Sequence, residues 1–422
     1  MIFENTLSFA QQADQNDVLR NFRNEFYIPS HNGHEAMYFT GNSLGLQPKA
    51  AEAALRTELE DWKNLGVEGH FQGKNPWFHY HKFLTENAAK IVGAKPLEVV
   101  VMNQLTSNLH FLFVSFYRPD AKRFKIIMEV GAFPSDMYLV ESQVRYHGFN
   151  PDEAIIEVKP RDGEHALRHE DIIATIDEHK DSVALVFFSG VQYYTGQVFN
   201  IEAITKKAHE VGAVAGFDLA HAAGNIDLQL HQWQVDFAAW CSYKYLNSGP
   251  GSVGGVFVHE NHAYNKELPR FAGWWGHNEN ERFKMLKGFD AEAGAAGWQL
   301  SNAPVLSMAV HKVSLDIFEK AGMSKLVEKG KQLNAYLNFV INEAITANPS
   351  LELNIITPPA PERGCQISVL TGENGKQLFD FLTQNGVIAD WRNPNVIRMA
   401  PVPLYNSFED IYRFGQILQS FK

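Results

Sequence analysis

Short apolar runs alternate with amphipathic stretches through the middle of the chain. Five runs have the length and composition of buried strands: Val99–Met102, Lys125–Val130, Val183–Phe188, Ala213–Phe217 and Phe237–Cys241. Between them, apolar residues recur at helical spacing over Pro48–Leu65, with Pro48 suited to the first turn, and over Ile201–Val211. Strands that alternate with helices in this way predict βαβ units and a mostly parallel, doubly wound sheet.

The pattern changes after about residue 300. A long helical region at 305–345 is followed by strand patterns at Leu351–Thr357, Gln366–Leu370 and Val387–Asp390, and by helical patterns at about 375–385 and 407–420. We therefore predict an α/β protein with an N-terminal arm at 1–35, a large domain at 36–300 and a smaller α+β C-terminal domain at 301–422. The sequence does not decide which domain the arm packs on.

Composition limits the classes of partner. The chain has 422 residues, which is long for a single core, and its formal net charge is −11, which disfavours nucleic acid and anionic membranes as partners. Cys241 and Cys365, the two cysteines, lie in apolar runs and suggest a reduced protein without disulfides. We find no signal peptide and no apolar stretch of the ~20 residues that span a bilayer. These features predict a soluble cytoplasmic protein that binds neither nucleic acid nor membrane.

The first chemical signal is a lysine and an aspartate that each follow a predicted strand. Lys244 comes after Phe237–Cys241 and before a glycine-rich loop, and Asp218 ends the run that begins at Ala213. Ligands of α/β sheets bind at this edge. Pyridoxal phosphate (PLP) needs an amine for a Schiff base and an acid that keeps its ring nitrogen protonated, which these residues can supply. Separately, a surface lysine at a turn and a capping aspartate are the commoner explanations.

Two further segments could complete a site for a phosphorylated, flat ligand. Thr106 and Ser107 follow the strand Val99–Met102 and precede an apolar helical run, so their free N–H groups could hold an anion. Phe133 follows the strand Lys125–Val130 and could stack on an aromatic ring. An ordinary helix cap and a packed phenylalanine are the alternatives for either segment alone.

Arg398 stands out because it lies within the apolar stretch Val396–Ala400. A buried arginine needs an anionic partner. The α-carboxylate of an amino-acid substrate can fill this role through two parallel hydrogen bonds. A structural ion pair with an Asp or Glu is the alternative.

Longer motifs resemble those of kynureninases, which are PLP enzymes of fold type I. They occur in order from about residue 38 to 415, so the resemblance covers most of the chain. The segments are Tyr38–Pro48, Phe188–Gln197, Asp218–Ala222, Ser242–Asn247, Gly273–His277, Arg392–Pro394 and Ile397–Asn406. Trp275 is the one local departure, since phenylalanine would also fit there.

The resemblance implies a role for each matched residue. Lys244 would bond to PLP, Asp218 would pair with the ring nitrogen, and Tyr243 would donate a proton during catalysis. Further cofactor contacts would come from Leu105, Thr106, Phe133, Ser135, Asp136, His221 and Tyr243, and from Trp274 and Asn302 of a second subunit in a homodimer. Substrate contacts would come from Arg398 at the α-carboxylate, from His70 and Tyr194 at the aromatic end, and from Ser301 and Asn302. No metal is expected.

The implied reaction is hydrolysis of the Cβ–Cγ bond of kynurenine or 3-hydroxykynurenine to an anthranilate and alanine, in tryptophan catabolism or NAD biosynthesis. His70 and Asn302 favour the 3-hydroxy substrate. The nearest rivals are another fold-type-I enzyme, such as an aminotransferase or a cysteine desulfurase, and a non-catalytic PLP-fold binding protein. Neither Cys241 nor Cys365 has the loop position of a desulfurase nucleophile, and no G-x-G-x-x-G follows a strand as a dinucleotide site would require.

Overall fold

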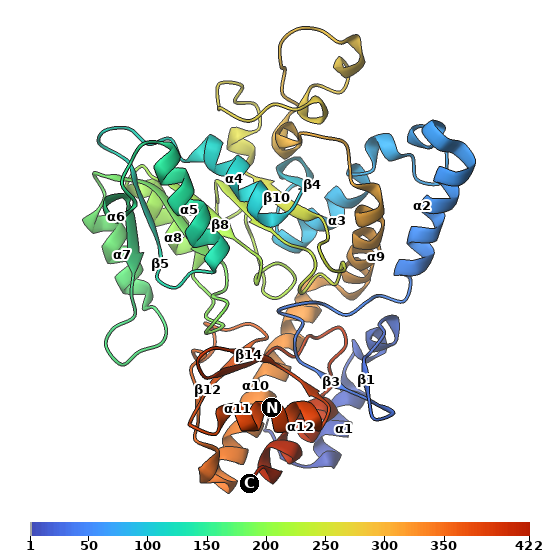
Figure 1. The fold of residues 1–422 in the computed structure, drawn as a ribbon, viewed down its shortest axis with the longest axis vertical. Coiled ribbons are helices and arrows are strands. Elements are labelled where there is room, and N and C mark those ends of the chain that lie inside the picture. Colours follow the sequence, from blue (N-terminus) through green and yellow to red (C-terminus); the bar gives the residue numbers. More distant parts are fainter. Residues whose placement is uncertain (1) are drawn as a thin grey trace.

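The computed structural model describes residues 2–422, and Figure 1 shows two bodies of unequal size. The helices are α1 (Leu7–Asn16), α2 (Ala51–Leu65), α3 (Lys82–Val92), α4 (Leu105–Phe116), α5 (Pro134–Tyr146), α6 (Pro151–Ala154), α7 (His169–Glu178), α8 (Ile201–Glu210), α9 (Val305–Ala321), α10 (Met323–Ala347), α11 (Gly375–Gln384) and α12 (Phe408–Ser420). No described helix combines the length and the apolar character needed to cross a membrane.

The strands are β1 (Ser30–His31), β2 (His34–Glu35), β3 (Met37–Tyr38), β4 (Val99–Met102), β5 (Lys125–Glu129), β6 (Ile155–Val158), β7 (Val183–Ser189), β8 (Val214–Asp218), β9 (Phe237–Trp240), β10 (Gly254–Val258), β11 (Leu353–Ile355), β12 (Ile367–Thr371), β13 (Val387–Ile388), β14 (Asp390–Arg392) and β15 (Val396–Met399). The large sheet has the order β4-β10-β9-β8-β7-β5-β6. The pairs from β9 to β6 are parallel, and β10 runs antiparallel to both of its neighbours. The predicted mostly parallel α/β sheet is therefore confirmed.

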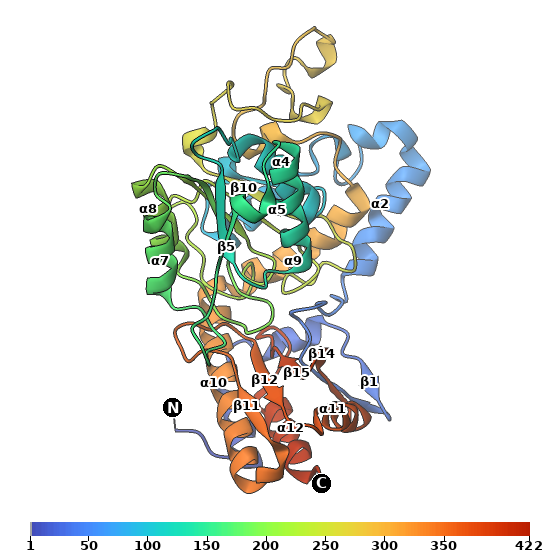
Figure 2. The same ribbon diagram turned by 60° about the vertical axis from the view of Figure 1, so that its left-hand side comes forward.

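The alternation of side chains along each strand divides the large core into two layers. Val100 and Met102 of β4 pack with α4 and α5, whereas Val99 and Val101 pack on the opposite face with α3 and α8. Figures 1 and 2 show α4 and α5 over one side of the sheet. A sheet covered on both faces explains why its strands appear in the sequence as continuous apolar runs.

The small body is built on the antiparallel sheet β11-β12-β15-β14, packed with α10, α11 and α12. The expected helical region at 305–345 is two helices, because the chain turns at Gly322, whose φ is 80°. Met308, Leu315 and Phe318 of α9 lie in the core of the large body. The stretch predicted as one strand at 387–390 is also two strands, with β13 paired to β3 and β14 in the four-stranded sheet.

Helix α2 begins later than its apolar pattern predicted. Its first residue is Ala51, and Pro48 accordingly lies before the helix rather than in its first turn. The carbonyl of Pro48 accepts a hydrogen bond from the N–H of Ala51 at 3.1 Å. Proline is therefore tolerated at this position because it acts only as an acceptor.

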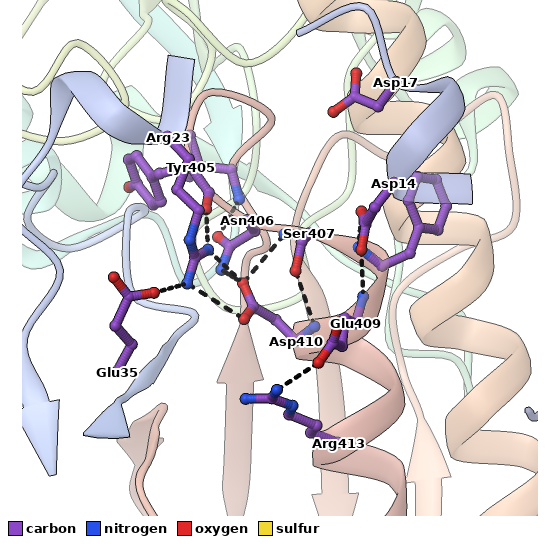
Figure 3. Close-up of polar contacts among 12 residues, drawn as sticks. Asp14, Asp17, Arg23, Glu35, Tyr405, Asn406, Ser407, Glu409, Asp410 and Arg413 are labelled. Atoms are coloured by element: carbon purple, nitrogen blue, oxygen red, sulfur yellow. Dashed lines mark hydrogen bonds and ion pairs between the residues drawn. The ribbon is translucent and has the colours of Figure 1, made fainter. Parts of the chain in front are cut away.

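The N-terminal arm packs on the small body, which the sequence left undecided (Figure 3). Asp14 accepts hydrogen bonds from the first N–H groups of α12, those of Phe408 at 2.8 Å and Glu409 at 3.0 Å. Arg23 forms an ion pair of 2.8 Å with Asp410 in the same helix turn. An acid at a helix N-terminus is favourable because it satisfies free N–H groups and the helix dipole.

Candidate functional site

The carboxyl ends of three parallel strands bring acidic and hydroxyl side chains together. Glu129 ends β5, Ser189 ends β7 and Asp218 ends β8, and the strand register pairs Ser189 with Asp218. Lys244 lies in the loop that follows β9. Parallel strands end at the same edge of the sheet, so these residues meet where α/β proteins bind ligands.

A cavity of about 380 Å³ opens at this edge. Its lining includes the predicted cofactor residues Leu105, Thr106, Phe133, Ser135, Asp136, Asp218, His221, Tyr243 and Lys244. The volume falls within the range of roughly 300–1,000 Å³ typical of small-molecule sites. The structure thus gathers residues from four separate segments into one pocket.

The Lys244 amine lies between two aromatic rings. Its Nζ is 5.7 Å from the centroid of Phe133 and 5.8 Å from that of Tyr243. The Phe133 ring also contacts Tyr193 edge to face, at 5.1 Å between centroids. The amine therefore faces a slot bordered by flat side chains, which suits a planar ligand.

The floor of the pocket is acidic and buried. Burial raises the pKa of Asp218, although Lys244 and a 2.7 Å hydrogen bond from the Ala220 N–H favour its ionised form. Burial and repulsion from Asp218 raise the pKa of Asp136 well above its usual range. Asp136 is therefore the acid that keeps its proton more readily of the two.

Other polar side chains of the pocket are neutral. Burial, together with the nearby Lys244 charge, holds the pKa of His221 well below its usual range, so the imidazole is uncharged at neutral pH. Burial also raises the pKa of the Tyr243 hydroxyl and of the Cys241 thiol. Tyr243 consequently remains a proton donor, and Cys241 is a thiol rather than a reactive thiolate.

Two helices begin in the lining of the pocket. Helix α4 begins at Leu105, just before the predicted Thr106 or Ser107, and α5 begins at Pro134 directly after Phe133. Neither N-terminus receives a hydrogen bond from its capping side chain. The first turn of α4 can therefore offer its N–H groups to an anion. In α5 the first residue is Pro134, which has no N–H, and the N–H of Asp136 already donates to the Phe133 carbonyl at 2.8 Å.

Arg398 and Tyr194 lie behind the pocket rather than in its lining. Arg398, in β15, is almost fully buried and is ion-paired with Asp390. Its Nη1 also donates to the carbonyl of Tyr193 at 2.6 Å, whereas its Nε has no partner. The carbonyl of Tyr194 accepts a 2.6 Å hydrogen bond from the Ser368 hydroxyl.

The remaining predicted site residues lie outside this pocket in the single chain. His70 packs edge to face on Trp77, at 5.4 Å between centroids. Ser301 and Asn302 are exposed, and so is Trp274, whose ring nitrogen donates to the Arg282 carbonyl at 3.1 Å.

Several pocket residues were not singled out from the sequence. They are Gln104, Ser189, Val191, Tyr193, Ala220, Cys241, Gly251 and Ser252, whereas Ser107, which the sequence proposed with Thr106 for an anion, does line the pocket. Ser189 could have been found by its position, since it ends the predicted strand Val183–Phe188 at the same edge as Asp218. Gly251 and Ser252 come from the loop after Lys244, whose path depends on tertiary packing.

A second cluster, Glu98, His231 and His259, has the residue types of a metal site. The rings of His231 and His259 are stacked, with 7° between their planes and 5.2 Å between centroids. A metal ion lies near the plane of each imidazole that binds it, and stacked parallel rings do not share such a point. Glu98 instead accepts hydrogen bonds from His231 and from the Glu260 N–H, both at 2.9 Å.

The pocket fits PLP by its distribution of charge and unpaired polar atoms. Its acidic floor matches a cationic ring nitrogen, and the N-terminus of α4 matches a phosphate. Asp136 Oδ1 and His221 Nδ1 are buried without a partner in the protein, as expected of atoms that bind a ligand. Lys244, in the same lining, supplies the amine.

Comparisons with known proteins agree with this assignment. The family model described as "Kynureninase C-terminal domain" matches residues 326–418. Proteins named kynureninase are 57% identical in Flavobacterium psychrophilum, over 99% of both chains, and 52% identical in Myxococcus xanthus, over 99% of this chain and 98% of the relative. The kynureninase of Nematostella vectensis is 48% identical over 98% of this chain and 93% of its own.

Solved structures share the fold at low identity. A C-DES mutant with glycine covalently linked to its PLP cofactor superposes with a TM-score of 0.75 at 15% identity, covering 92% of this chain and 97% of that chain. An apo cysteine desulfurase from Thermococcus onnurineus superposes with a TM-score of 0.73 at 16% identity, covering 91% and 94%. These likenesses confirm the predicted fold type.

Proposed function

The chain belongs to the kynureninase family of PLP-dependent hydrolases, and from this premise we propose how its pocket performs the reaction. The reaction is hydrolysis of the Cβ–Cγ bond of kynurenine or 3-hydroxykynurenine, which yields the corresponding anthranilate and alanine. The observation that carries the assignment of the site is the single cavity that joins Lys244, Asp218 and the first turn of α4.

The floor and the amine of the pocket have complementary tasks. When bound, PLP supplies an aldehyde for amines and a ring that accepts electrons from bonds beside the amine-bearing carbon. Asp218 would hold the proton on the ring nitrogen. Lys244 would hold the aldehyde and would be the base for the substrate Cα proton.

Proton donation and substrate orientation fall to residues around this centre. Tyr243, whose hydroxyl keeps its proton because its pKa is raised by burial, donates to the Cβ of the substrate after the bond breaks. Arg398 binds the α-carboxylate. Its guanidinium must then donate hydrogen bonds to Asp390 and to the substrate at the same time. The unpaired Nε of Arg398 supports this role, because a buried donor without a partner is costly.

The rival desulfurase activity is disfavoured by the cysteines. That chemistry needs a reactive thiolate, and burial raises the pKa of Cys365 to about 12 and that of Cys241 above its usual value. Both side chains are buried. An enzyme that releases sulfide from cysteine is therefore not the function that this pocket favours.

Product analysis tests the proposal. The purified protein with PLP should convert kynurenine to anthranilate and alanine in equal amounts, without an added amino acceptor. An aminotransferase would instead form a keto acid only when an acceptor is present, and a desulfurase would release sulfide from cysteine. Absence of anthranilate with a bound cofactor would contradict the proposal.

We further propose 3-hydroxykynurenine as the preferred substrate, with His70 and Asn302 at its hydroxyl. Both side chains can exchange hydrogen bonds with a phenol, and a site built to bind a hydroxyl discriminates against the substrate that lacks it. The ratio of kcat/KM for the two substrates tests this choice. Asn302→Ala should reduce the preference, whereas a wild-type ratio that favours kynurenine would reverse the assignment.

We also propose a homodimer with a shared site. The segment 264–291 projects from the large body (Figure 1) and exposes Phe271, Trp274, Phe283, Met285 and Leu286. Exposed apolar groups concentrated on one projection are typical of an interface. They support the prediction that Trp274 and Asn302 reach the pocket of a second subunit. The cytoplasmic location remains a prediction from the sequence.

Complementation tests the shared site. Lys244→Ala and Trp274→Ala, each poorly active alone, would be mixed and allowed to exchange subunits. A shared site regains about a quarter of wild-type activity, because half of the dimers are mixed and each has one intact site. A site built from one chain regains none.

A further inference from the structure

Glu129 is a buried acid that the mechanism above does not use. It is the last residue of β5 and is only 2% exposed. Its carboxylate accepts hydrogen bonds from the Ser189 hydroxyl and, at 3.2 Å, from the Ser189 N–H. Within residues 2–422, the charged group that acts on it most is another acid, Asp218.

The surroundings of Glu129 bring three acids to one edge of the sheet. Ser189, on the neighbouring strand β7, separates Glu129 from Asp218 on β8. Asp136 reaches the same floor from the first turn of α5, and Lys244 is the cation that acts on both aspartates. Three buried carboxyls beside one cation do not all ionise, because each further charge is repelled and poorly solvated.

Glu129 is the member of this group that titrates near neutral pH. Burial raises its pKa to about 7, although the hydrogen bonds from Ser189 oppose the rise and repulsion from Asp218 adds to it. Without a bound cation on the floor of the pocket, the Glu129 carboxyl is thus largely protonated in slightly acidic solution. A positive charge placed on the floor would favour loss of that proton.

We propose that Glu129 is a positioning residue that acts through Asp218, and that its carboxyl releases a proton to solvent when a cationic ring nitrogen binds on the floor of the pocket. The inference rests on the proposed PLP function. Asp218 is the acid beside the ring nitrogen. Ionised Glu129 adds a second negative charge near it, and this charge stabilises the protonated form of the ring.

Calorimetric titration of PLP into the apoprotein measures the release of this proton. Repeating the titration in two buffers of different ionisation enthalpy gives the number of protons released on binding. At about pH 6.5, wild type should release up to about one proton more than Glu129→Gln, which carries no acid there. At about pH 9 the two proteins should release the same number, because Glu129 is then already ionised.

Two further variants complete the test. Glu98→Gln changes an equally buried acid outside the pocket, which bonds to the N–H groups of Lys95 and Glu260, and it should match wild type. Ser189→Ala removes the hydroxyl hydrogen bond that favours ionised Glu129 and keeps the one from the backbone N–H, so the extra proton should be released at higher pH than in wild type.

The outcomes separate this inference from the function on which it rests. If no variant and no wild-type protein binds PLP, the proposed function fails. If PLP binds and the proton number is the same for wild type and Glu129→Gln at every pH, the role of Glu129 is refuted. Should Glu129→Gln not fold, an unchanged pH profile in Ser189→Ala refutes it equally.

Discussion

Arg398 Nη1 donates a 2.6 Å hydrogen bond to the backbone carbonyl of Tyr193, which joins the small body to the wall of the pocket. The same guanidinium lies 5.9 Å from the centroid of the Tyr193 ring, and that ring lines the cavity. Arg398 therefore lies beside a residue that lines the cavity, without lining the cavity itself. Its proposed role in binding substrate depends on this contact.

Replacing Arg398 by glutamine should raise KM about 10- to 100-fold with a smaller effect on kcat, because a charge-assisted contact present in both ground and transition state is lost. Steady-state kinetics measures the changes in KM and kcat separately. Stability should fall by only about 1–3 kcal/mol, since Arg392 still pairs with Asp390 at 3.0 Å. The control Asp390→Asn keeps the Arg398 charge and should lower Tm with little change in KM. An unaltered KM in Arg398→Gln would make the residue purely structural.

Lys244→Ala should bind PLP without a covalent link and lose at least about 10³-fold in kcat, because both the amine and the base disappear. Mass spectrometry after borohydride reduction should find the cofactor attached to wild type and absent from the variant. Lys49→Ala changes an exposed lysine that lies over the Tyr27 ring, and it should behave as wild type. Covalent cofactor in Lys244→Ala would place the reactive amine elsewhere.

Asp236 makes stability depend on pH through its own ionisation and that of His209. Burial alone would raise its pKa, but hydrogen bonds from His209 and His262, both 2.8 Å, lower it to about 2. The same bond raises the pKa of His209. The acid therefore stabilises the fold above about pH 4 and loses this effect as pH falls towards 2. The histidine stabilises it below about pH 6.5 and loses this effect as pH rises through its raised pKa.

Asp236→Asn should consequently lower the free energy of unfolding by about 2 kcal/mol between about pH 4 and 6.5, and by less at higher pH. Thermal unfolding of wild type and variant across this range measures the difference. A constant difference in Tm from pH 4 to 9 would show that the ionisation of His209 is not linked to that of Asp236.

Lys329 and Asp17 form a 2.7 Å ion pair that fastens the N-terminal arm to α10, with side-chain exposures of 7% and 6%. Lys329→Met should lower the free energy of unfolding by about 3–5 kcal/mol. The Asp17 side chain is then left buried without its partner, and Asp14 and Asp410 lose a nearby cation. Asp17→Asn should cost less, since Lys329 still has those two acids. Chemical denaturation gives both values, and an equal loss in the two variants would contradict this account.

Much of the site was predictable because strand ends are visible in a sequence. Lys244, Asp218 and Phe133 each follow an apolar run, and parallel strands must end at one edge of a sheet. The antiparallel strand β10 was missed because its position between β4 and β9 depends on long-range pairing. The split at Gly322 was missed because helical periodicity continues on both sides of it.

The sequence alone determined the alternation of strands and helices and the residue types at the strand ends, since these follow from local periodicity and side-chain chemistry. Tertiary structure alone decided which acids share the floor of the pocket and which of them keep protons, because burial and the distances between charges arise only when β5, α5 and β8 meet. It also decided the partner of Arg398 and the docking of the arm. The contact of Arg398 with the Tyr193 carbonyl and the docking of the arm join segments that are hundreds of residues apart, as the 2.8 Å pair of Arg23 and Asp410 also shows.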